Sequence, residues 1–152
     1  MKLLKTILYV LPIIWGIVPE CQALNKNYYG LEKELPTIRK AAERNNCKGE
    51  LFTILLAIRK AENGGDGFQF GVIAVKGTNL DKQAGWCAAT IVKNYQRWKA
   101  IGETDGGIPA YISFLGDRYC PISAANDPDG LNKNWKRNVL NWFMKFKKAG
   151  IR

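Results

Sequence analysis

One helix that is apolar on nearly every face is the feature that most restricts how this chain can fold. The segment 51–61 (LFTILLAIRKA) is interrupted only by Thr53, Arg59 and Lys60. A helix without a broad polar face has to be covered on all sides, so it belongs in the middle of a domain. The sequence therefore predicts a single domain built around this helix.

A carboxylate stands at the end of this helix. Ile54, Ile58 and Glu62 are spaced four residues apart, so Glu62 continues a stripe that should face the core. The glycine-rich loop 63–67 (NGGDG) then stops the helix. A carboxyl group half out of water favours its neutral form, which raises its pKa toward the range useful to a general acid. Glu62 is thus the candidate catalytic group. The alternative is a glutamate at a frayed helix end that points to solvent.

Helical spacing recurs along the rest of the chain, and only one segment has a strand-like composition. Helices are predicted over 31–45, from about 79 to 98 and over 131–148, with a short one at 111–115 that Gly116 ends. Residues 68–75 (FQFGVIAV) favour a strand but are few, so we expect a small hairpin or an irregular stretch. The expected fold is mainly α, with at most a small β hairpin.

The first residues resemble a targeting segment. Lys2 and Lys5 precede an apolar run over 7–18. That run is shorter than the roughly 20 residues of a membrane-spanning helix, and Cys21-Gln22-Ala23 follows as a small-x-small cleavage site. We expect residues 1–23 to be a secretory signal peptide and 24–152 the mature catalytic domain, a monomer that is secreted or periplasmic. The alternative is an uncleaved membrane anchor.

Composition limits the chemistry. The 152 residues include 23 Lys and Arg against 13 Asp and Glu, a net charge of +10, and no histidine. Such a surface attracts polyanions, which for an exported protein we expect to be anionic wall polymers or anionic lipid rather than nucleic acid. Without histidine there is no Ser-His or Cys-His nucleophile pair and no His-ligated metal. No zinc or dinucleotide motif is present either, so we expect no metal or cofactor and are left with carboxylate chemistry.

Three of the four cysteines lie beyond the predicted cleavage site, at Cys47, Cys87 and Cys120. Export permits disulfides. Three cysteines allow one bridge, for which Cys87 with Cys120 is the favoured pair. The alternative is that all three are buried small residues.

Two short segments resemble a known superfamily. The run 55–64 (LLAIRKAENG), followed by Phe70-Gly71-Val72, is similar to the catalytic segment of lytic transglycosylases and goose-type lysozymes. A helix of small residues at 81–98 and a tyrosine-bearing segment at 108–119 follow in a similar order. The resemblance covers about residues 48–146, and its specific part is the glutamate motif.

This resemblance implies a lysozyme-like domain whose buried helix ends at the catalytic Glu62 and whose glycine-containing strand borders the substrate cleft. The family usually has Glu-Ser and Gly-Leu-Met-Gln at these places. Here the residues are Glu62-Asn63 and 70–73 (FGVI), with Gln69 before the glycine. The role of Glu62 therefore transfers from the family, whereas that of the strand glutamine does not.

The expected reaction is cleavage of the β-1,4 bond between N-acetylmuramic acid and N-acetylglucosamine in peptidoglycan glycan strands. Glu62 would protonate the leaving oxygen and then, as a carboxylate, activate either water or the sugar's own hydroxyl. The second choice would give the anhydro product of a transglycosylase. The first candidate for a second catalytic carboxylate is Asp66, which lies beside Glu62 in the loop. The second candidate is Asp81, although its favourable interaction with the helix dipole in a first helical turn already explains that residue.

Candidate substrate contacts lie in the loop after the helix and in the tyrosine-bearing segment. Gln69 can donate and accept hydrogen bonds, and Phe70 and Gly71 belong to the cleft segment that the resemblance implies. For the tyrosine usual in the family, Tyr111 is the first choice and Tyr119 the second. Further aromatic faces suited to sugar rings are offered by Trp86, Tyr95, Trp98 and Trp135.

Two other functions remain open. A noncatalytic cationic protein would bind an anionic wall, membrane or nucleic acid through the basic, aromatic helix 131–148, although ordinary packing with a solvated lysine end also explains that helix. Chitin is the alternative substrate, because its bond chemistry is the same.

Overall fold

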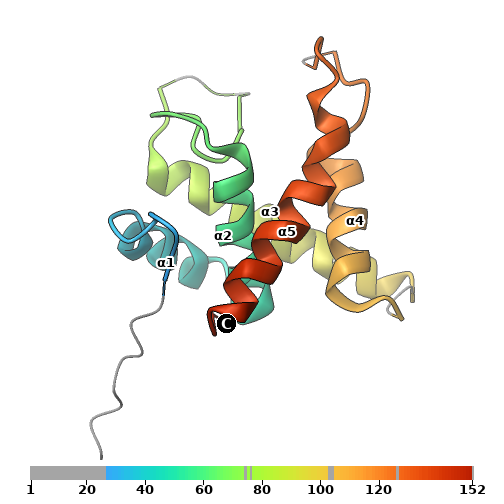
Figure 1. Ribbon diagram of the computed structural model, residues 1–152, viewed down its shortest axis with the longest axis horizontal. Coiled ribbons are helices and arrows are strands. Elements are labelled where there is room, and N and C mark those ends of the chain that lie inside the picture. The colour runs from blue at the N-terminus through green and yellow to red at the C-terminus, as the bar shows by residue number, and fades with distance from the viewer. Residues whose placement is uncertain (1–26, 74, 76, 103–104, 126, 152) are drawn as a thin grey trace, which may run out of the picture.

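The computed structural model describes residues 27–151 except 74, 76, 103–104 and 126. The predicted signal peptide lies outside these residues. The described chain forms five α-helices, one short 3-10 helix and no strand, so the mainly α prediction is confirmed. In chain order (Figure 1) the elements are α1 (Leu35–Arg44), α2 (Glu50–Glu62), α3 (Leu80–Ala100), α4 (Gly107–Tyr119), η1 (Leu131–Asn134) and α5 (Trp135–Lys148).

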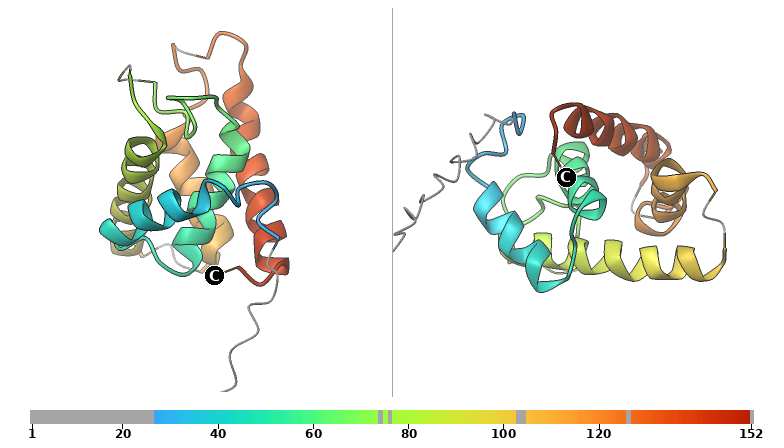
Figure 2. Two further views of the ribbon diagram at one scale, coloured as in Figure 1. Left: turned by 90° about the vertical axis from the view of Figure 1, so that its left-hand side faces the viewer. Right: turned by 90° about the horizontal axis from the view of Figure 1, so that it is seen from below.

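The central position of α2 follows from its sequence. All residues from Phe52 to Arg59 are buried, and Ile54 to Ile58 have no exposed surface. Helix α2 packs against α3 and α5, while α1 covers α3 and α4 joins α3 to α5. Figure 2 shows α2 enclosed between α3 and α5, with α1 and α4 at the two ends of the layer. Burying each large aliphatic side chain stabilises the fold by about 1.5–3 kcal/mol, so the five consecutive apolar residues of α2 without exposed surface contribute strongly to stability.

The polar side chains that interrupt the apolar surface of α2 all have hydrogen-bond partners. Arg59, which is 9% exposed, donates from Nε and Nη2 to the two carboxylate oxygens of Glu34, both at 2.7 Å. Thr53 Oγ1 lies 3.3 Å from the carbonyl oxygen of Ile151, and Lys60 Nζ donates to the carbonyl oxygen of Tyr29 at 2.9 Å. Buried polar groups are tolerated when they are hydrogen-bonded, which explains how this helix carries them in the core.

Helices α2 and α5 lie antiparallel. Lys147 of α5 pairs with Glu50 at the start of α2, and Trp135 at the start of α5 donates a hydrogen bond to Glu62 at the end of α2. The contact between these two helices therefore runs the length of both. It brings the first turn of α5 to Glu62.

Two predicted helix limits were wrong for identifiable reasons. The first helix begins at Leu35 rather than 31, because Pro36 suits only a first helical turn. The predicted short helix 111–115 runs over the whole of α4, and Gly116 lies inside it. A Cβ at Gly116 would be 2.6 Å from Lys136 Cγ and 3.2 Å from Trp135 Cε3, so this glycine lets α5 approach instead of ending a helix.

The favoured Cys87–Cys120 disulfide is not formed, and Cys47, Cys87 and Cys120 are all free thiols. Cys87 is fully buried on α3, whereas the Cys120 thiol points elsewhere and lies 2.8 Å from Asn132 Oδ1. The alternative of buried small residues holds for Cys47 and Cys87, while Cys120 is partly exposed. None of the helices formed by the described residues is both long and apolar enough to cross a membrane.

Candidate active site around Glu62

Glu62 is the last residue of α2 and its side chain is half-buried. Trp135 Nε1 donates a hydrogen bond to Glu62 Oε1 at 2.7 Å. Burial raises the pKa of the Glu62 carboxyl above its ordinary value, and the Trp135 hydrogen bond offsets part of that rise. Within the described chain, no hydrogen-bond donor reaches Oε2. The carboxyl group is therefore held on one oxygen, and the other is available to carry a proton.

Gly71 lies directly against this carboxyl group. Its φ is +69°, and a Cβ there would be 2.4 Å from Glu62 Oε2. Only glycine combines that backbone conformation with so close an approach. Gly71, which was predicted to lie in a strand that borders the substrate cleft, thus lies against the Glu62 carboxyl, in a loop and not in a strand.

The loop that carries Gly71 is held by a residue that sequence reasoning missed. Gln83 of α3 has no exposed surface, and its Oε1 accepts from the backbone N–H groups of Phe70 and Val72 at 3.4 and 3.2 Å. Its Nε2 lies 2.9 Å from the carbonyl oxygen of Gly67 and 2.8 Å from that of Val72. Its position in the sequence could have identified it, because Gln83 lies four residues before the buried Cys87 and therefore on the same inward-facing stripe of α3.

Tyr119 is the tyrosine that lies near Glu62. Its hydroxyl donates to the carbonyl oxygen of Phe70 at 2.6 Å, and its ring stacks on that of Trp135 with centroids 5.3 Å apart. Burial keeps the pKa of the Tyr119 phenol well above its usual range, so it stays a neutral donor. Tyr119 therefore positions both the Gly71 loop and the indole that binds Glu62.

The first choice, Tyr111, is placed elsewhere. It has no exposed surface, its hydroxyl donates to the carbonyl oxygen of Ile91 at 2.5 Å, and its ring packs against Tyr95 and Trp98. These contacts make Tyr111 part of the core between α3 and α4. We remove it from the candidate substrate contacts and keep Tyr119 as a positioning residue.

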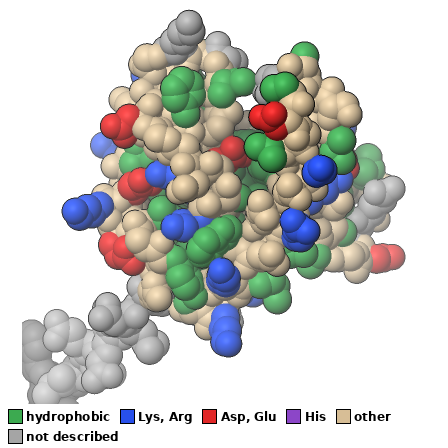
Figure 3. Space-filling model, turned by 45° about the horizontal axis from the view of Figure 1, so that its top comes forward, with side chains coloured by type: hydrophobic (Ala, Val, Ile, Leu, Met, Phe, Trp, Pro, Cys, Tyr) green, Lys and Arg blue, Asp and Glu red, His purple; other side chains and the backbone are tan. Residues whose placement is uncertain are grey.

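A pocket of about 310 Å³ opens beside Glu62. The residues that line it come from the end of α2, the segment after α4, η1 and the first turns of α5: Ala61, Glu62, Cys120, Leu131, Asn132, Asn134, Trp135 and Asn138. The surface is hollowed on the face shown in Figure 3, where acidic and hydrophobic side chains meet at the hollow. Apart from Glu62 and Cys120, the lining of the pocket carries no ionisable group.

Asparagine amides provide most of the hydrogen-bonding capacity of the pocket. Asn132 is held by its neighbours, since its Nδ2 donates to the carbonyl oxygen of Pro121 at 2.8 Å. Asn134 Oδ1 accepts from Arg137 at 2.9 Å, and its amide N–H groups donate to no other residue that the structure describes. Asn138 is exposed, and its side chain makes no hydrogen bond within the described residues. The pocket therefore offers neutral donors and acceptors next to a protonatable carboxyl, an arrangement suited to hydroxyl and acetamido groups.

The other predicted site residues lie outside this pocket. Asp66 is exposed in the turn after α2, and Asp81 pairs with Arg44 on the surface at 2.8 Å. Gln69 and Phe70 are both buried, and Gln69 Oε1 has no hydrogen-bond partner among the described residues. Phe70 contributes to the site through its backbone, which bonds to Gln83 and Tyr119.

The aromatic faces proposed for sugar rings are mostly occupied. Trp98 and Trp135 are 4% and 6% exposed, so their rings are packed inside the protein. Trp135 acts through its N–H group instead. Trp86 is 37% exposed on α3, and it does not line the Glu62 pocket.

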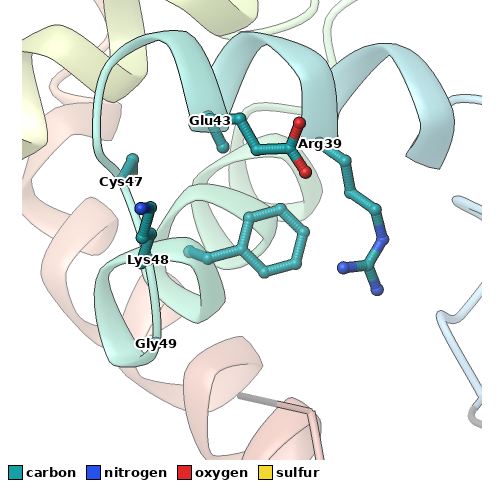
Figure 4. A pocket seen from close by; sticks show the side chains of 7 residues that line it. Arg39, Glu43, Cys47, Lys48 and Gly49 are labelled. Carbon is teal, nitrogen blue, oxygen red and sulfur yellow. The ribbon is translucent and has the colours of Figure 1, made fainter.

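A second pocket of about 180 Å³ lies at the other end of α2 (Figure 4). Arg39 and Glu43 of α1 border it, and the guanidinium of Arg39 lies 5.0 Å from the Phe52 ring centroid. Burial raises the pKa of the Cys47 thiol in this pocket to about 12, so the thiolate that a nucleophile needs is not formed near neutral pH. This pocket holds exposed charges of both signs and no activated group.

No metal centre is visible in the parts of the chain that the structure covers, because no three His, Cys, Asp or Glu side chains come close enough to share an ion. No protein-family model, curated protein or solved structure matches this chain.

Proposed function

We propose that this protein is a secreted or periplasmic enzyme that cleaves the β-1,4 glycosidic bond of peptidoglycan glycan strands, with Glu62 as general acid and then base. The observation that carries the proposal is a half-buried carboxyl of raised pKa that faces a pocket of neutral amides. A glycosidic oxygen leaves readily only when a positioned acid protonates it, and such catalysis contributes about 10²–10⁴-fold to a rate.

The surrounding residues have separate tasks in this mechanism. Trp135 fixes the orientation of the carboxyl through Oε1, and the Gly71 backbone packs against the carboxyl on the side of Oε2. The proton leaves Glu62 for the leaving oxygen, and the resulting carboxylate accepts a proton from the incoming nucleophile. The Trp135 hydrogen bond then stabilises the anion formed on Glu62.

The lining of the pocket bears on the choice between hydrolysis and transglycosylation. Two-carboxylate glycosidases place their second carboxyl roughly 5 to 9.5 Å from the first. Among the described residues, Glu62 is the only carboxylate that lines the pocket, and Asp66 lies outside it. This favours a single-carboxyl route in which Glu62 activates the sugar's own hydroxyl, giving an anhydro product lighter by one water than a hydrolysed end.

Two alternatives are kept beside this proposal. A noncatalytic cationic protein that binds an anionic wall, membrane or nucleic acid is supported by the net charge of +10 and by the lysines of α5. Chitin is the alternative substrate, because amide-lined pockets suit any acetamido sugar.

The deciding experiment compares wild type with Glu62→Gln on purified peptidoglycan and on chitin oligomers, with products identified by mass. Glutamine keeps an oxygen for Trp135 to bind but cannot act as an acid. The matched control is Glu43→Gln, the same change at an exposed residue of the other pocket. Lost turnover with retained wall binding would support catalysis by Glu62. Equal activity of wild type and Glu62→Gln would refute it, and binding without turnover in wild type would support the cationic alternative.

A further inference from the structure

Two ammonium groups converge on one indole ring beside the proposed active site. Lys145 Nζ lies 4.2 Å and Lys60 Nζ 5.1 Å from the ring centroid of Trp142. Lys60 comes from α2, and the other two residues come from α5. We call these three residues the Trp142 cluster. Trp142 is half-buried and packs edge-on against Tyr29, so the ring that gathers the two lysines is fixed in place.

The positive charge of this cluster is not neutralised by the described protein. The ion pairs among the described residues join Arg44 to Asp81, Arg59 to Glu34, Lys136 to Asp117 and Lys147 to Glu50. None of them includes Lys60 or Lys145. Lys60 donates one hydrogen bond, to the carbonyl oxygen of Tyr29, and an ammonium group has three protons to donate. Two like charges held at one ring repel each other, so an anion that reaches both is favoured there.

The cluster lies on the same face of α5 as the amides of the Glu62 pocket. Asn134, Asn138 and Trp142 are four residues apart, and Lys145 follows Asn138 by seven, so all four share one side of the helix. A helix rises 1.5 Å per residue, which places Trp142 about 6 Å and Lys145 about 10 Å beyond Asn138 along the axis. On α2, the consecutive residues Ala61 and Lys60 border the pocket and the cluster respectively.

We propose that the Trp142 cluster binds the carboxylates of the peptide attached to the glycan strand while the Glu62 pocket holds the sugars. The inference rests on the proposed function and names its substrate more closely. The residues that line the pocket supply amides but no cation, whereas the Trp142 cluster, further along α5, supplies two ammonium groups as the counter-charge for a carboxylate on the substrate. The protein then prefers peptide-bearing glycan to chitin, which carries no carboxylate.

The test measures binding without turnover, in a Glu62→Gln background. A disaccharide carrying its peptide and a peptide-free N-acetylglucosamine tetramer are titrated by calorimetry at low and moderate salt. We expect Lys60→Gln/Lys145→Gln to weaken binding of the peptide-bearing disaccharide about tenfold, as for loss of charge-assisted contacts to a carboxylate. Binding of the tetramer should change less than twofold. The Lys60→Arg/Lys145→Arg variant should retain binding of both ligands.

The matched control is Lys93→Gln/Lys148→Gln, which removes the same charge at exposed positions. An equal loss in both double variants, or no loss in either, overturns the inference. So does a lysine-dependent affinity for poly(glycerol phosphate) that the peptide-bearing disaccharide does not share. Circular dichroism checks that each variant is folded.

Failure of the inference is distinguishable from failure of the proposed function. Lysine-dependent binding of the peptide-bearing disaccharide by a wild type that cleaves nothing supports the Trp142 cluster and refutes catalysis. Cleavage by wild type with lysine-independent binding refutes the Trp142 cluster and supports catalysis.

Discussion

The two ends of α2 are built in different ways. At its start, the turn after α1 closes through local hydrogen bonds, in which the backbone N–H groups of Asn45, Asn46 and Cys47 and the side chain of Asn45 donate to carbonyl oxygens of α1. At its end, side chains from three other helices take part: Gln83 of α3 and Tyr119 of α4 hold the loop after Glu62, and Trp135 of α5 holds Glu62 itself. A simple turn needs no such support. The concentration of buried polar side chains at the Glu62 end indicates a loop whose position matters for the carboxyl group.

Electrostatics separates the two ends as well. At the start of α2, Arg39, Glu43 and Lys48 are exposed to water. At the other end, the Glu62 carboxyl is desolvated and its pKa is raised. Exposed charges interact weakly, whereas a carboxyl kept partly from water can be neutral near the working pH. The carboxyl with the raised pKa therefore lies at the end of α2 where a charge is isolated, and not at the end where charges are most numerous.

The largest effect on stability is expected from removing the side chain that holds the loop. Gln83→Leu leaves the buried backbone groups of residues 67–72 without partners, so we expect a loss of roughly 3–5 kcal/mol in the free energy of unfolding. Gln96→Leu, an exposed change on the same helix, should cost less than about 0.5 kcal/mol. Denaturant unfolding measures both. Similar values for the two variants would contradict the role given to Gln83.

A pair of glycines tests the contact with Glu62. Gly49 and Gly71 both have positive φ, +58° and +69°, but a Cβ at Gly49 would meet nothing within 4 Å. Gly49→Ala should therefore show only the backbone cost, about 1–3 kcal/mol at its φ of 58° and ψ of −129°, and keep its activity. Gly71→Ala adds a collision with Glu62 Oε2 to its backbone cost, so we expect a larger destabilisation than for Gly49→Ala and a loss of glycan cleavage. Thermal unfolding and a product assay separate them, and equal behaviour of the two would show that the carboxyl moves aside freely.

The Trp135 hydrogen bond should be visible in a pH profile. Because this bond lowers the Glu62 pKa against the effect of burial, Trp135→Phe raises that pKa further. A general acid loses activity as pH rises through its pKa, so the upper limb of the kcat/KM profile should move to higher pH. Trp86→Phe, on the exposed side of α3, should leave the limb in place. A limb that does not move, or that moves down, would disprove the assignment of that limb to Glu62.

The smallest expected effect is a change in stability with pH. The folded pKa of Glu62 lies above its unfolded value, so the folded state binds more protons between the two values and wild type loses stability as pH rises through that window. Glu62→Gln does not titrate there. The free energy of unfolding of Glu62→Gln relative to that of wild type should therefore increase across this pH window, by about 1.4 kcal/mol for each unit of difference between the folded and unfolded pKa. A constant difference from pH 4 to pH 8, measured by denaturant unfolding, would mean that burial does not perturb Glu62.

Several parts of this fold were open to prediction because the signal is local. The apolar run of α2 predicted a central helix, and the spacing of Ile54, Ile58 and Glu62 predicted an inward carboxyl. The helices are set by periodicity over adjacent turns, which the sequence displays directly. Errors arose at Gly116 and Tyr111, where a residue suited to two environments was assigned to the wrong one.

The candidate site was predictable only in part, because its contacts join residues far apart in the chain. Glu62 meets Trp135 and Phe70 meets Tyr119 across 73 and 49 residues. No local sequence pattern indicates that an indole will donate a hydrogen bond to a carboxyl. Nor does one indicate that the Gln83 side chain will hydrogen-bond the loop backbone as a neighbouring strand would.

The sequence by itself determined that a helix apolar on all sides must be buried and that Glu62, continuing its stripe, must be drawn partly out of water. Which groups meet that carboxyl was decided by the antiparallel packing of α5 on α2, which brings Trp135, the asparagines and the Trp142 cluster to one side of it. Periodicity acts between neighbouring turns and is written in the order of residues. Which aromatic and amide side chains reach the carboxyl depends on how whole helices pack against one another. That packing is established only in the folded domain, where the other helices surround α2.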